Sequence, residues 1–164
     1  MQLRIAEIQN AEDVTRVINA AFKKAESFLI DRDRIEVEKV REMMGTGQFL
    51  VAEEAGTIAG CVYVERRGER AYLGLLAVDP SLQKSGLGSK LMTVAEEHCR
   101  AMGCGFVDLQ IVNLRKELPE FYRKRGYVET GTGPFTAGVE TKAPCHFIKM
   151  AKELGQKRAT DLHG

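Results

Sequence analysis

The sequence predicts an α/β domain of the α+β type, in which one mixed, mostly antiparallel sheet of six to seven strands carries helices on both faces. Three observations support this prediction. The 164 residues suit a domain with a single hydrophobic core. Short segments of alternating apolar and polar residues are interspersed with segments whose apolar residues recur at helical spacing. Neither an internal repeat nor a linker interrupts the chain, so its elements belong to one unit.

The first half of the chain predicts one strand, two helices and three further strands. Residues 3–7 alternate apolar with polar side chains, which is the pattern of a strand. Asn10 can cap a helix whose apolar residues, from Val14 to Phe22, fall on one face. The later segments are a short helix over 37–44 that ends at Gly45 and Gly47, and an antiparallel meander of strands over 49–52, 58–64 and 71–78.

The second half of the chain predicts an amphipathic helix, a strand, a short helix and two more strands. The amphipathic helix ends before Gly103, and its polar face is expected to carry Lys90, Glu96, Glu97 and Arg100. The later segments are a strand over 106–112, a helix over 118–125, a strand starting at Tyr127, a loop from Gly131 to about Pro144, and a last strand over 145–150. The order is therefore β-α-α-β-β-β-α-β-α-β-β, in a single domain over residues 1–152 with a polar C-terminal tail over 153–164.

The composition excludes several classes of partner. Lysine plus arginine (24) nearly equals aspartate plus glutamate (23), so the net charge of +1 gives no general electrostatic reason to bind nucleic acid or anionic membrane. No apolar run reaches the length of a signal peptide or a membrane-spanning helix. We therefore expect no nucleic-acid partner, no membrane partner and a cytoplasmic location.

The four cysteines contain no CxxC pair, and only three histidines accompany them. Structural zinc sites usually need such paired ligands, so we expect no metal site. In a reducing compartment the cysteines are expected to be free thiols that pack as small apolar side chains.

The segment from Leu76 to Ser89 carries the most chemical information. A strand that includes Leu76-Ala77-Val78 passes through Asp79-Pro80 into the glycine-containing turn Gln83-Lys84-Ser85-Gly86-Leu87-Gly88, which opens the amphipathic helix. Such a turn directs unpaired N–H groups and the positive end of a helix dipole at one spot, which suits a pyrophosphate. The P-loop pattern is absent, and the third glycine of a dinucleotide fingerprint is missing. A turn that only caps the helix is the alternative.

These residues resemble a known motif. L-x-V-x-P followed by Q-x-x-G-x-G is similar to the acetyl-CoA-binding motif of the GNAT superfamily of N-acetyltransferases, in its R/Q-x-x-G-x-G/A form. Asn113 and the run Phe121-Tyr122-Arg-Lys-Arg-Gly126-Tyr127 resemble later elements of that family, in order and at typical spacing. The resemblance therefore covers about residues 3–150.

The resemblance implies a role for each matched position. The main chain of Leu76, Ala77 and Val78 would bind the pantetheine arm, with the Val78 N–H placed to bind the thioester oxygen. Asn113 would bind the cofactor arm or an ordered water, and Tyr122 would protonate the leaving thiolate unless it is only a core tyrosine. The pyrophosphate cradle would comprise Gln83, Lys84, Ser85, Gly86, Leu87, Gly88 and Ser89.

The implied activity is transfer of acetyl from acetyl-CoA to a primary amine of a small molecule or peptide, by direct attack in a ternary complex without a metal. Its partners would be acetyl-CoA and an amine acceptor, and the family habit of pairing through the last strands implies a homodimer. The alternative is a non-catalytic acyl-CoA-binding or sensor module. This alternative stays open because Tyr72 stands where some family members carry a glutamate base.

The acceptor side is less well defined by the sequence. On a regular strand, Gly74 would face the same side as Tyr72 and Leu76 and would leave room beside the thioester. The general base stays open, and so does any group that binds a carboxylate on the acceptor. Candidates for the first role, acting through water, are Glu53, Glu54, Glu65 and Asp108, and candidates for the second are Arg32, Arg34 and Arg115.

Overall fold

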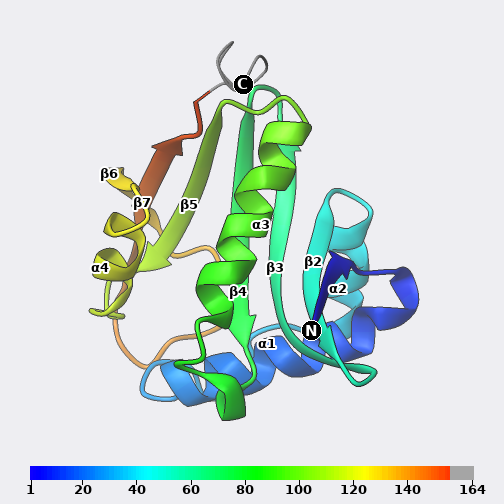
Figure 1. The fold of residues 1–164 in the computed structure, drawn as a ribbon. Coiled ribbons are helices and arrows are strands. Elements are labelled where there is room, and N and C mark those ends of the chain that lie inside the picture. Colours follow the sequence, from blue (N-terminus) through cyan, green and yellow to red (C-terminus); the bar gives the residue numbers. More distant parts are fainter. Residues whose placement is uncertain (156–164) are drawn as a thin grey trace.

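The computed structural model describes residues 1–155 and contains one seven-stranded sheet in the order β1-β2-β3-β4-β5-β7-β6 (Figure 1). Neighbouring strands are antiparallel except β4 and β5, which are parallel. The predicted fold class and element order are confirmed. The strands are β1 (Gln2–Ile5), β2 (Gln48–Glu54), β3 (Thr57–Arg67), β4 (Arg70–Val78), β5 (Phe106–Val112), β6 (Val128–Pro134) and β7 (His146–Glu153). The helices are α1 (Ala11–Glu26), α2 (Val37–Met44), α3 (Leu87–Ala101) and α4 (Leu118–Arg123), with short 3-10 turns η1 (Ile8–Asn10) and η2 (Pro80–Leu82).

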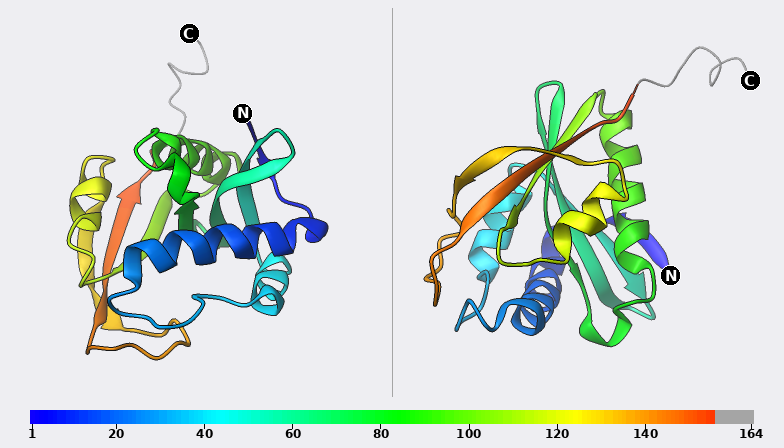
Figure 2. Two further views of the ribbon diagram at one scale, coloured as in Figure 1. Left: turned by 90° about the horizontal axis from the view of Figure 1, so that it is seen from below. Right: turned by 90° about the vertical axis from the view of Figure 1, so that its left-hand side faces the viewer.

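Helices cover both faces of the sheet, as Figure 2 shows for α1 and α3. The face with α1 and α2 has its own core, to which α1 contributes Val14, Val17 and Ile18. The other face packs against α3 and α4, and Leu91 and Tyr122 belong to that second core. The helical spacing of apolar residues therefore predicted correctly which side of each long helix is buried.

Two boundaries near the C-terminus differ from the sequence-based prediction. The prediction of a loop that begins at Gly131 is wrong for residues 131–134, because β6 continues to Pro134 and pairs with β7. Gly131, Gly133 and Pro134 have low strand propensity, and the partner strand supplies the pairing. The ordered domain also extends past residue 152, since Leu154 is buried and its N–H donates to the Gly105 carbonyl at 2.8 Å. Most of the predicted tail, residues 156–164, lies outside the described residues.

Glu96 is buried, which contradicts its expected place on the polar face of α3. Only 4% of it is exposed, and its carboxylate accepts hydrogen bonds from the Tyr127 hydroxyl at 2.9 Å and from Lys152 Nζ at 2.8 Å. Arg125 lies 3.8 Å away. A charge can be buried when partners of this kind compensate it, and here they tie α3 to β7 and to the segment after α4.

The sheet opens between its two parallel strands. β4 and β5 pair only from Arg70 with Phe106 to Tyr72 with Asp108, although both strands continue beyond these residues. A bulge in β4 accompanies the opening, because two of its residues, Leu75 and Leu76, lie opposite one residue of β3. Leu75 has a left-handed backbone with φ of +51°. The resulting gap exposes the second half of β4.

Candidate active site

The bulge in β4 reverses the alternation of its side chains. Tyr72 and Leu75 both pack with the core on the α1 face, whereas Leu76 packs with the core on the α3 face. The expectation that Tyr72, Gly74 and Leu76 share one side is therefore wrong for Leu76. A Cβ atom at Gly74 would lie 2.9 Å from atoms of the Tyr72 ring. The Tyr72 ring fills the space directly over Gly74, but both residues line the same cleft, so Gly74 does belong to a pocket wall.

The end of β4 presents backbone groups to the gap. The Asp79 N–H donates to the Ala59 carbonyl of β3 at 2.8 Å, and Ala77 pairs with Cys61 of the same strand. Because N–H groups alternate along a strand, the Val78 N–H points to the opposite side, where β5 has diverged. This is the group that the sequence predicted to bind a thioester oxygen.

The turn after β4 leads directly into α3 and leaves its first N–H groups free. Lys84 and Gly86 have left-handed backbones, with φ of +68° and +84°, and Gly86 is the N-cap residue. The first bond of the helix is donated by the Lys90 N–H to the Gly86 carbonyl at 3.1 Å. Within residues 1–155, the N–H groups of Leu87, Gly88 and Ser89 have no backbone acceptor. They can therefore bind an anion at the positive end of the helix dipole.

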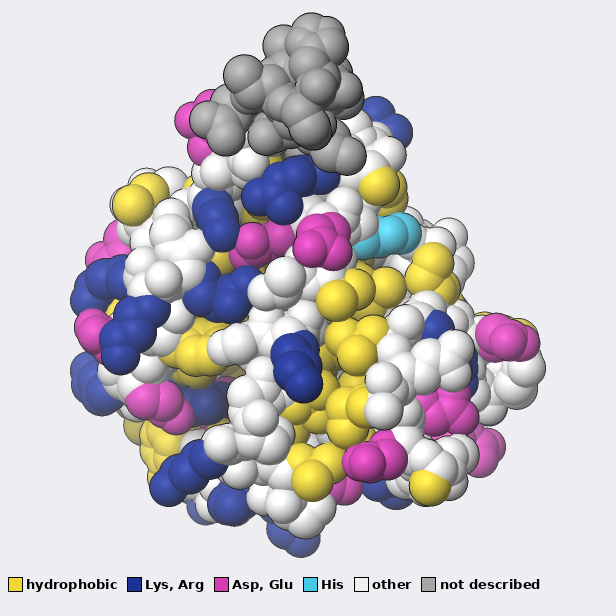
Figure 3. Space-filling model, in the orientation of Figure 1, with side chains coloured by type: hydrophobic (Ala, Val, Ile, Leu, Met, Phe, Trp, Pro, Cys, Tyr) yellow, Lys and Arg dark blue, Asp and Glu magenta, His cyan; other side chains and the backbone are white. Residues whose placement is uncertain are grey.

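A cleft of about 1550 Å³ joins this turn to the gap between the strands. Figure 3 shows a hollow with hydrophobic side chains on that side of the molecule, with Lys and Arg side chains around it. Ser85 and Asn113, both predicted site residues, are not in the cleft lining among the described residues. The predicted residues that do line it are Leu76, Ala77, Val78, Gln83, Lys84, Gly86, Leu87, Gly88, Ser89 and Tyr122.

Asn113 has a structural contact that the sequence did not reveal. Its side-chain oxygen accepts a hydrogen bond from the His146 N–H at 2.9 Å, and its own N–H donates to the His146 carbonyl at 2.9 Å. These two bonds join the end of β5 to the start of β7. Its side-chain oxygen is thus already engaged within the protein.

Tyr122 reaches the cleft from α4 on the face that carries α3. Its ring packs edge-on against Phe121 at 5.0 Å and Tyr127 at 5.7 Å between centroids. Burial raises the pKa of Tyr122 to about 12, an effect that the charges of Arg115 and Arg125 oppose. Among the described residues its hydroxyl makes no hydrogen bond. The hydroxyl therefore keeps its proton at neutral pH and is open to a ligand.

The four carboxylates considered as general bases are all accounted for. Glu53 binds Arg4 at 2.7 Å, and neither it nor Glu54 lines the cleft. Glu65 lines the cleft. Burial alone would raise the pKa of its carboxyl group, but hydrogen bonds from Arg67 and Tyr63 hold that pKa below the ordinary value. Asp108 accepts two hydrogen bonds from one guanidinium, that of Arg70, at 2.7 and 2.6 Å. None of them is a free carboxylate within the cleft.

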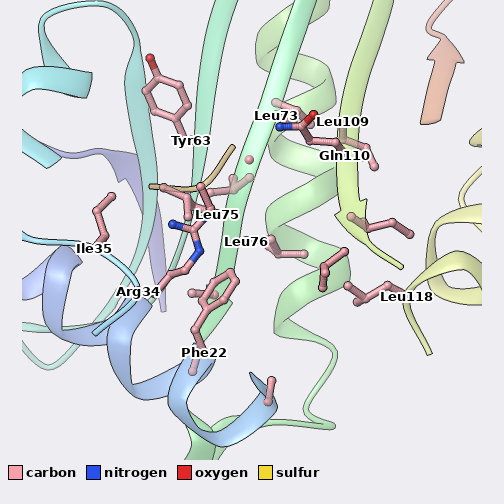
Figure 4. A pocket seen from close by; sticks show the side chains of 18 of the residues that line it. Phe22, Arg34, Ile35, Tyr63, Leu73, Leu75, Leu76, Leu109, Gln110 and Leu118 are labelled. Carbon is pink, nitrogen blue, oxygen red and sulfur yellow. The ribbon is translucent and has the colours of Figure 1, made fainter. Parts of the chain in front are cut away.

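The three arginines considered for the acceptor side differ in their surroundings. Arg115 binds the buried carboxylate of Glu26 at 2.9 Å and also contacts Glu117 at 3.1 Å. Arg32 is exposed, and Arg34 lies over the ring of Phe22 at 5.5 Å. Figure 4 shows Arg34 directed towards Leu75 on the α1 side of the gap, while Leu76 and Leu118 lie on the other side.

Sequence reasoning missed Glu26, which is 4% exposed at the end of α1 and lines the cleft. The helical period did contain the signal. Glu26 lies four residues after Phe22, on the face of α1 that begins with Val14, so the pattern placed a carboxylate on a buried stripe.

The four cysteines lie outside the cleft lining. Cys61, Cys99 and Cys104 are buried, and burial raises the pKa of both Cys61 and Cys99 to about 12. Within residues 1–155, no group of three or more His, Cys, Asp or Glu side chains is placed to hold a metal ion. None of the helices in that range is long and apolar enough to cross a bilayer.

Comparisons with known proteins agree with this geometry. The model of the acetyltransferase (GNAT) domain family matches residues 18–154. Glucosamine 6-phosphate N-acetyltransferase 1 of Oryza sativa subsp. japonica is 34% identical over 105 residues, which cover 58% of this chain and 62% of that enzyme. IAA acetyltransferase of Azospirillum brasilense is 24% identical over 136 residues, covering 81% of this chain and 84% of that enzyme. The structure of an aminoglycoside 6'-N-acetyltransferase complexed with coenzyme A has the same fold, with a TM-score of 0.74, 19% identity, and coverage of 96% and 99%.

Proposed function

The chain belongs to the family of GNAT acetyltransferases, and from this premise we propose that it transfers acetyl from acetyl-CoA to a primary amine of a small molecule or peptide. One observation carries the proposal. The gap between β4 and β5 opens the Val78 N–H, the free N–H groups of α3 and the Tyr122 hydroxyl to the same cleft. The two relatives named above are both acetyltransferases, which supports acetyl-CoA as the donor.

The donor would lie along the backbone groups of the cleft. Its pyrophosphate would bind the N–H groups of Leu87, Gly88 and Ser89, within the turn that starts at Gln83 and includes Lys84, Ser85 and Gly86. Its pantetheine arm would lie against Leu76, Ala77 and Val78 in the place of a paired strand. Asn113 keeps its side-chain NH₂ group for the arm or for a water, since the structure engages only its oxygen.

The reaction would proceed by direct attack in a ternary complex. The amine nitrogen attacks the thioester carbon, and the Val78 N–H stabilises the negative charge that develops on the oxygen. The carbon–sulfur bond then breaks, and the coenzyme A sulfur takes the Tyr122 proton. A thiolate that is partly desolvated in the cleft is more basic than one in water, which favours transfer of the Tyr122 proton to it.

The acceptor must lose a proton before it attacks, because a primary amine with a pKa of about 10.4 is mostly an ammonium ion at neutral pH. Glu65 and Asp108 are both held by arginines, so we assign this proton to solvent water. Attack by the free amine leaves an extra proton on its nitrogen, and this proton passes to solvent water as the carbon–sulfur bond breaks and the amide forms. Tyr122, which has protonated the thiolate, regains a proton from solvent.

The test is calorimetric titration of the purified protein with acetyl-CoA, followed by thiol release against a panel of amines in the same sample. Binding together with amine-dependent thiol release is expected. Binding without release would favour the non-catalytic sensor module, which the tyrosine at position 72 keeps as the second candidate. Absence of binding would overturn the proposal. A homodimer and a cytoplasmic location stay predictions, to be checked by light scattering and by cell fractionation.

A further inference from the structure

Arg34 is a half-buried cation in the wall of the cleft. None of the carboxylates in residues 1–155 lies within ion-pair distance of it, and it makes no hydrogen bond there. The nitrogen atoms of Arg34 remain accessible to a ligand. Within residues 1–155, the side-chain nitrogen that is fully buried without a hydrogen-bond partner belongs to Arg125 (Nε) and not to Arg34. Burial lowers the pKa of Arg34, and the charges of Glu26 and Tyr72 oppose this effect only partly. A partly buried charge is unfavourable without a counter-ion, so the surroundings of Arg34 favour the binding of an anion.

The other arginines that line the cleft already have their counter-ions or are solvated. Arg115 holds Glu26, and Arg67 donates to Glu65. Arg32 is exposed to solvent. Glu26 is thus one buried carboxylate beside two guanidinium groups, and it is hydrogen-bonded to Arg115. Among the arginines of residues 1–155 that line the cleft, Arg34 is therefore the one that has neither a counter-ion nor full exposure to solvent.

The position of Arg34 relates it to the proposed reaction. Figure 4 shows its guanidinium beside Leu75, the left-handed residue of the bulge, and above Phe22. Leu75 is three residues before Val78, whose N–H would bind the thioester oxygen. A molecule held by Arg34 would therefore extend towards the gap from the side opposite Tyr122. Phe22, Ile35 and Leu75 would contact its carbon atoms.

From these contacts we infer that the acceptor is a small amino acid whose free carboxylate binds the guanidinium of Arg34 while its amine is acetylated. This inference rests on the proposed acetyl transfer and adds the substrate class. A guanidinium matches a carboxylate with two parallel hydrogen bonds, and the partial burial of Arg34 strengthens such a pair.

The test compares acceptors that differ only in the carboxylate. The proteinogenic amino acids are assayed by thiol release beside their carboxamides, after binding of acetyl-CoA has been measured. At least one amino acid is expected to exceed its amide in kcat/KM by about tenfold or more, the range of a partly desolvated charge-assisted pair.

Arg34→Met keeps an apolar stem over Phe22 and removes the charge. For the preferred amino acid, this variant is expected to lower kcat/KM by about 100-fold, mainly through KM, and to leave the amide within about twofold. Arg32→Met removes a neighbouring exposed charge and is the matched control, which should retain the preference for the amino acid.

Thermal unfolding gives a readout that does not depend on the acceptor. Arg34→Met is expected to keep or raise Tm, because it removes a desolvated cation without a counter-ion. Arg115→Met is expected to lower Tm, because it leaves the Glu26 carboxylate buried without its partner. A lower Tm for Arg34→Met would identify Arg34 as a structural partner of Glu26 and overturn the inference.

The failures can be told apart. Turnover of amines without any preference for a carboxylate, or equal losses for acid and amide in Arg34→Met, would overturn the acceptor class and leave the acetyl transfer intact. Failure to bind acetyl-CoA would overturn both.

Discussion

The two sides of the cleft, which we propose to hold the donor and the acceptor, would bind their ligands by different means. The donor side consists mainly of backbone: the N–H groups at the start of α3 and the end of a bulged, splayed strand. The acceptor side consists of side chains that come from separate parts of the chain, among them Phe22, Glu26, Arg34 and Arg115. Binding by backbone groups depends on the conformation of a few residues, whereas the specificity of a site made of side chains can change with each substitution.

This difference explains why the sequence pattern indicated residues for the proposed donor side but not for the acceptor side. Gly86 and Gly88 mark a backbone conformation and a close approach, and both stand within a few residues of β4. Arg34 and Arg115 are 81 positions apart by their numbering, and no local spacing relates them. Substitutions on the donor side should therefore affect every acceptor equally, and substitutions on the acceptor side should change which amine is used.

The largest effect is expected from Gly88→Val. A Cβ atom at Gly88 would contact only Phe121 and Val78, each at 3.9 Å, so the protein itself has room for a side chain. Replacing glycine within the first turn of a helix should not lower stability. The valine would nevertheless occupy the space that a phosphate needs, and acetyl-CoA affinity should fall by at least about 100-fold, or about 2.7 kcal/mol.

Titration with acetyl-CoA and a thermal melt measure both quantities on one sample. Gly88→Ala adds a single carbon atom and should lie between the wild type and Gly88→Val in affinity. Retained affinity in the valine variant would show that α3 does not hold the pyrophosphate.

Tyr122→Phe should lower kcat by about 100-fold, the usual contribution of a general acid, and leave acetyl-CoA affinity within about twofold. The ring would stay packed between Phe121 and Tyr127, so stability should not change. Single-turnover kinetics and titration separate the two effects. Equal losses in turnover and affinity would exclude the role of acid.

Tyr127→Phe is the matched control because it removes a hydroxyl five residues away on the same side of the sheet. That hydroxyl donates to the buried Glu96 at 2.9 Å. Its loss should cost about 1.5–3 kcal/mol of unfolding free energy, as for hydrogen bonds to charged groups, while kcat stays near the wild-type value. Denaturant unfolding measures the first quantity.

Most of the fold could be predicted from the sequence, because local patterns determine it. Alternation and helical spacing located the strands and the buried faces of α1 and α3. They failed where tertiary contacts decide the structure. Glu96 is polar and lies beside exposed Glu97, yet partners that are distant in sequence, Tyr127 and Lys152, make its burial favourable. Residues 131–134 form a strand only because β7 pairs with them.

Most residues predicted for the donor side line the cleft, whereas the sequence left the acceptor side open. The bulge at Leu75 could not be seen in the sequence, because its left-handed backbone occurs at a residue that rarely adopts it. This one residue moves Leu76 to the other face, so Leu76 does not share a side with Tyr72 as the sequence predicted. The contact of Asn113 with His146 likewise depends on two strands that are adjacent only in the fold.

The pH dependence of kcat/KM also distinguishes the two sides of the cleft, because Tyr122 and the acceptor amine act in opposite protonation states. Tyr122 acts in its protonated form, and its raised pKa of about 12 keeps that form present through the alkaline range. The amine acts in its neutral form, so kcat/KM should rise about tenfold per pH unit up to the pKa of the acceptor, about 10.4 for an alkylamine. No decline is expected below pH of about 11. A rate that is already level well below the pKa of the amine would instead indicate a protein base, and a plateau in the acidic range would fit a carboxylate such as Glu65, whose pKa is held below the ordinary value.

The smallest effect is expected from Cys61→Ala. Cys61 lies opposite Ala77 on the donor side, and its thiol is wholly buried, with a pKa raised to about 12 by burial despite a backbone hydrogen bond at Ala77. Its thiolate is therefore too scarce to form an acyl-enzyme, and turnover should stay within about twofold of the wild type. Mass spectrometry of the wild type, incubated with acetyl-CoA without acceptor, should find no acetylated cysteine. Detection of an acetyl group on Cys61 would contradict direct transfer and indicate a two-step mechanism through an acyl-enzyme. The donor side would then act through a side chain, as we propose for the acceptor side.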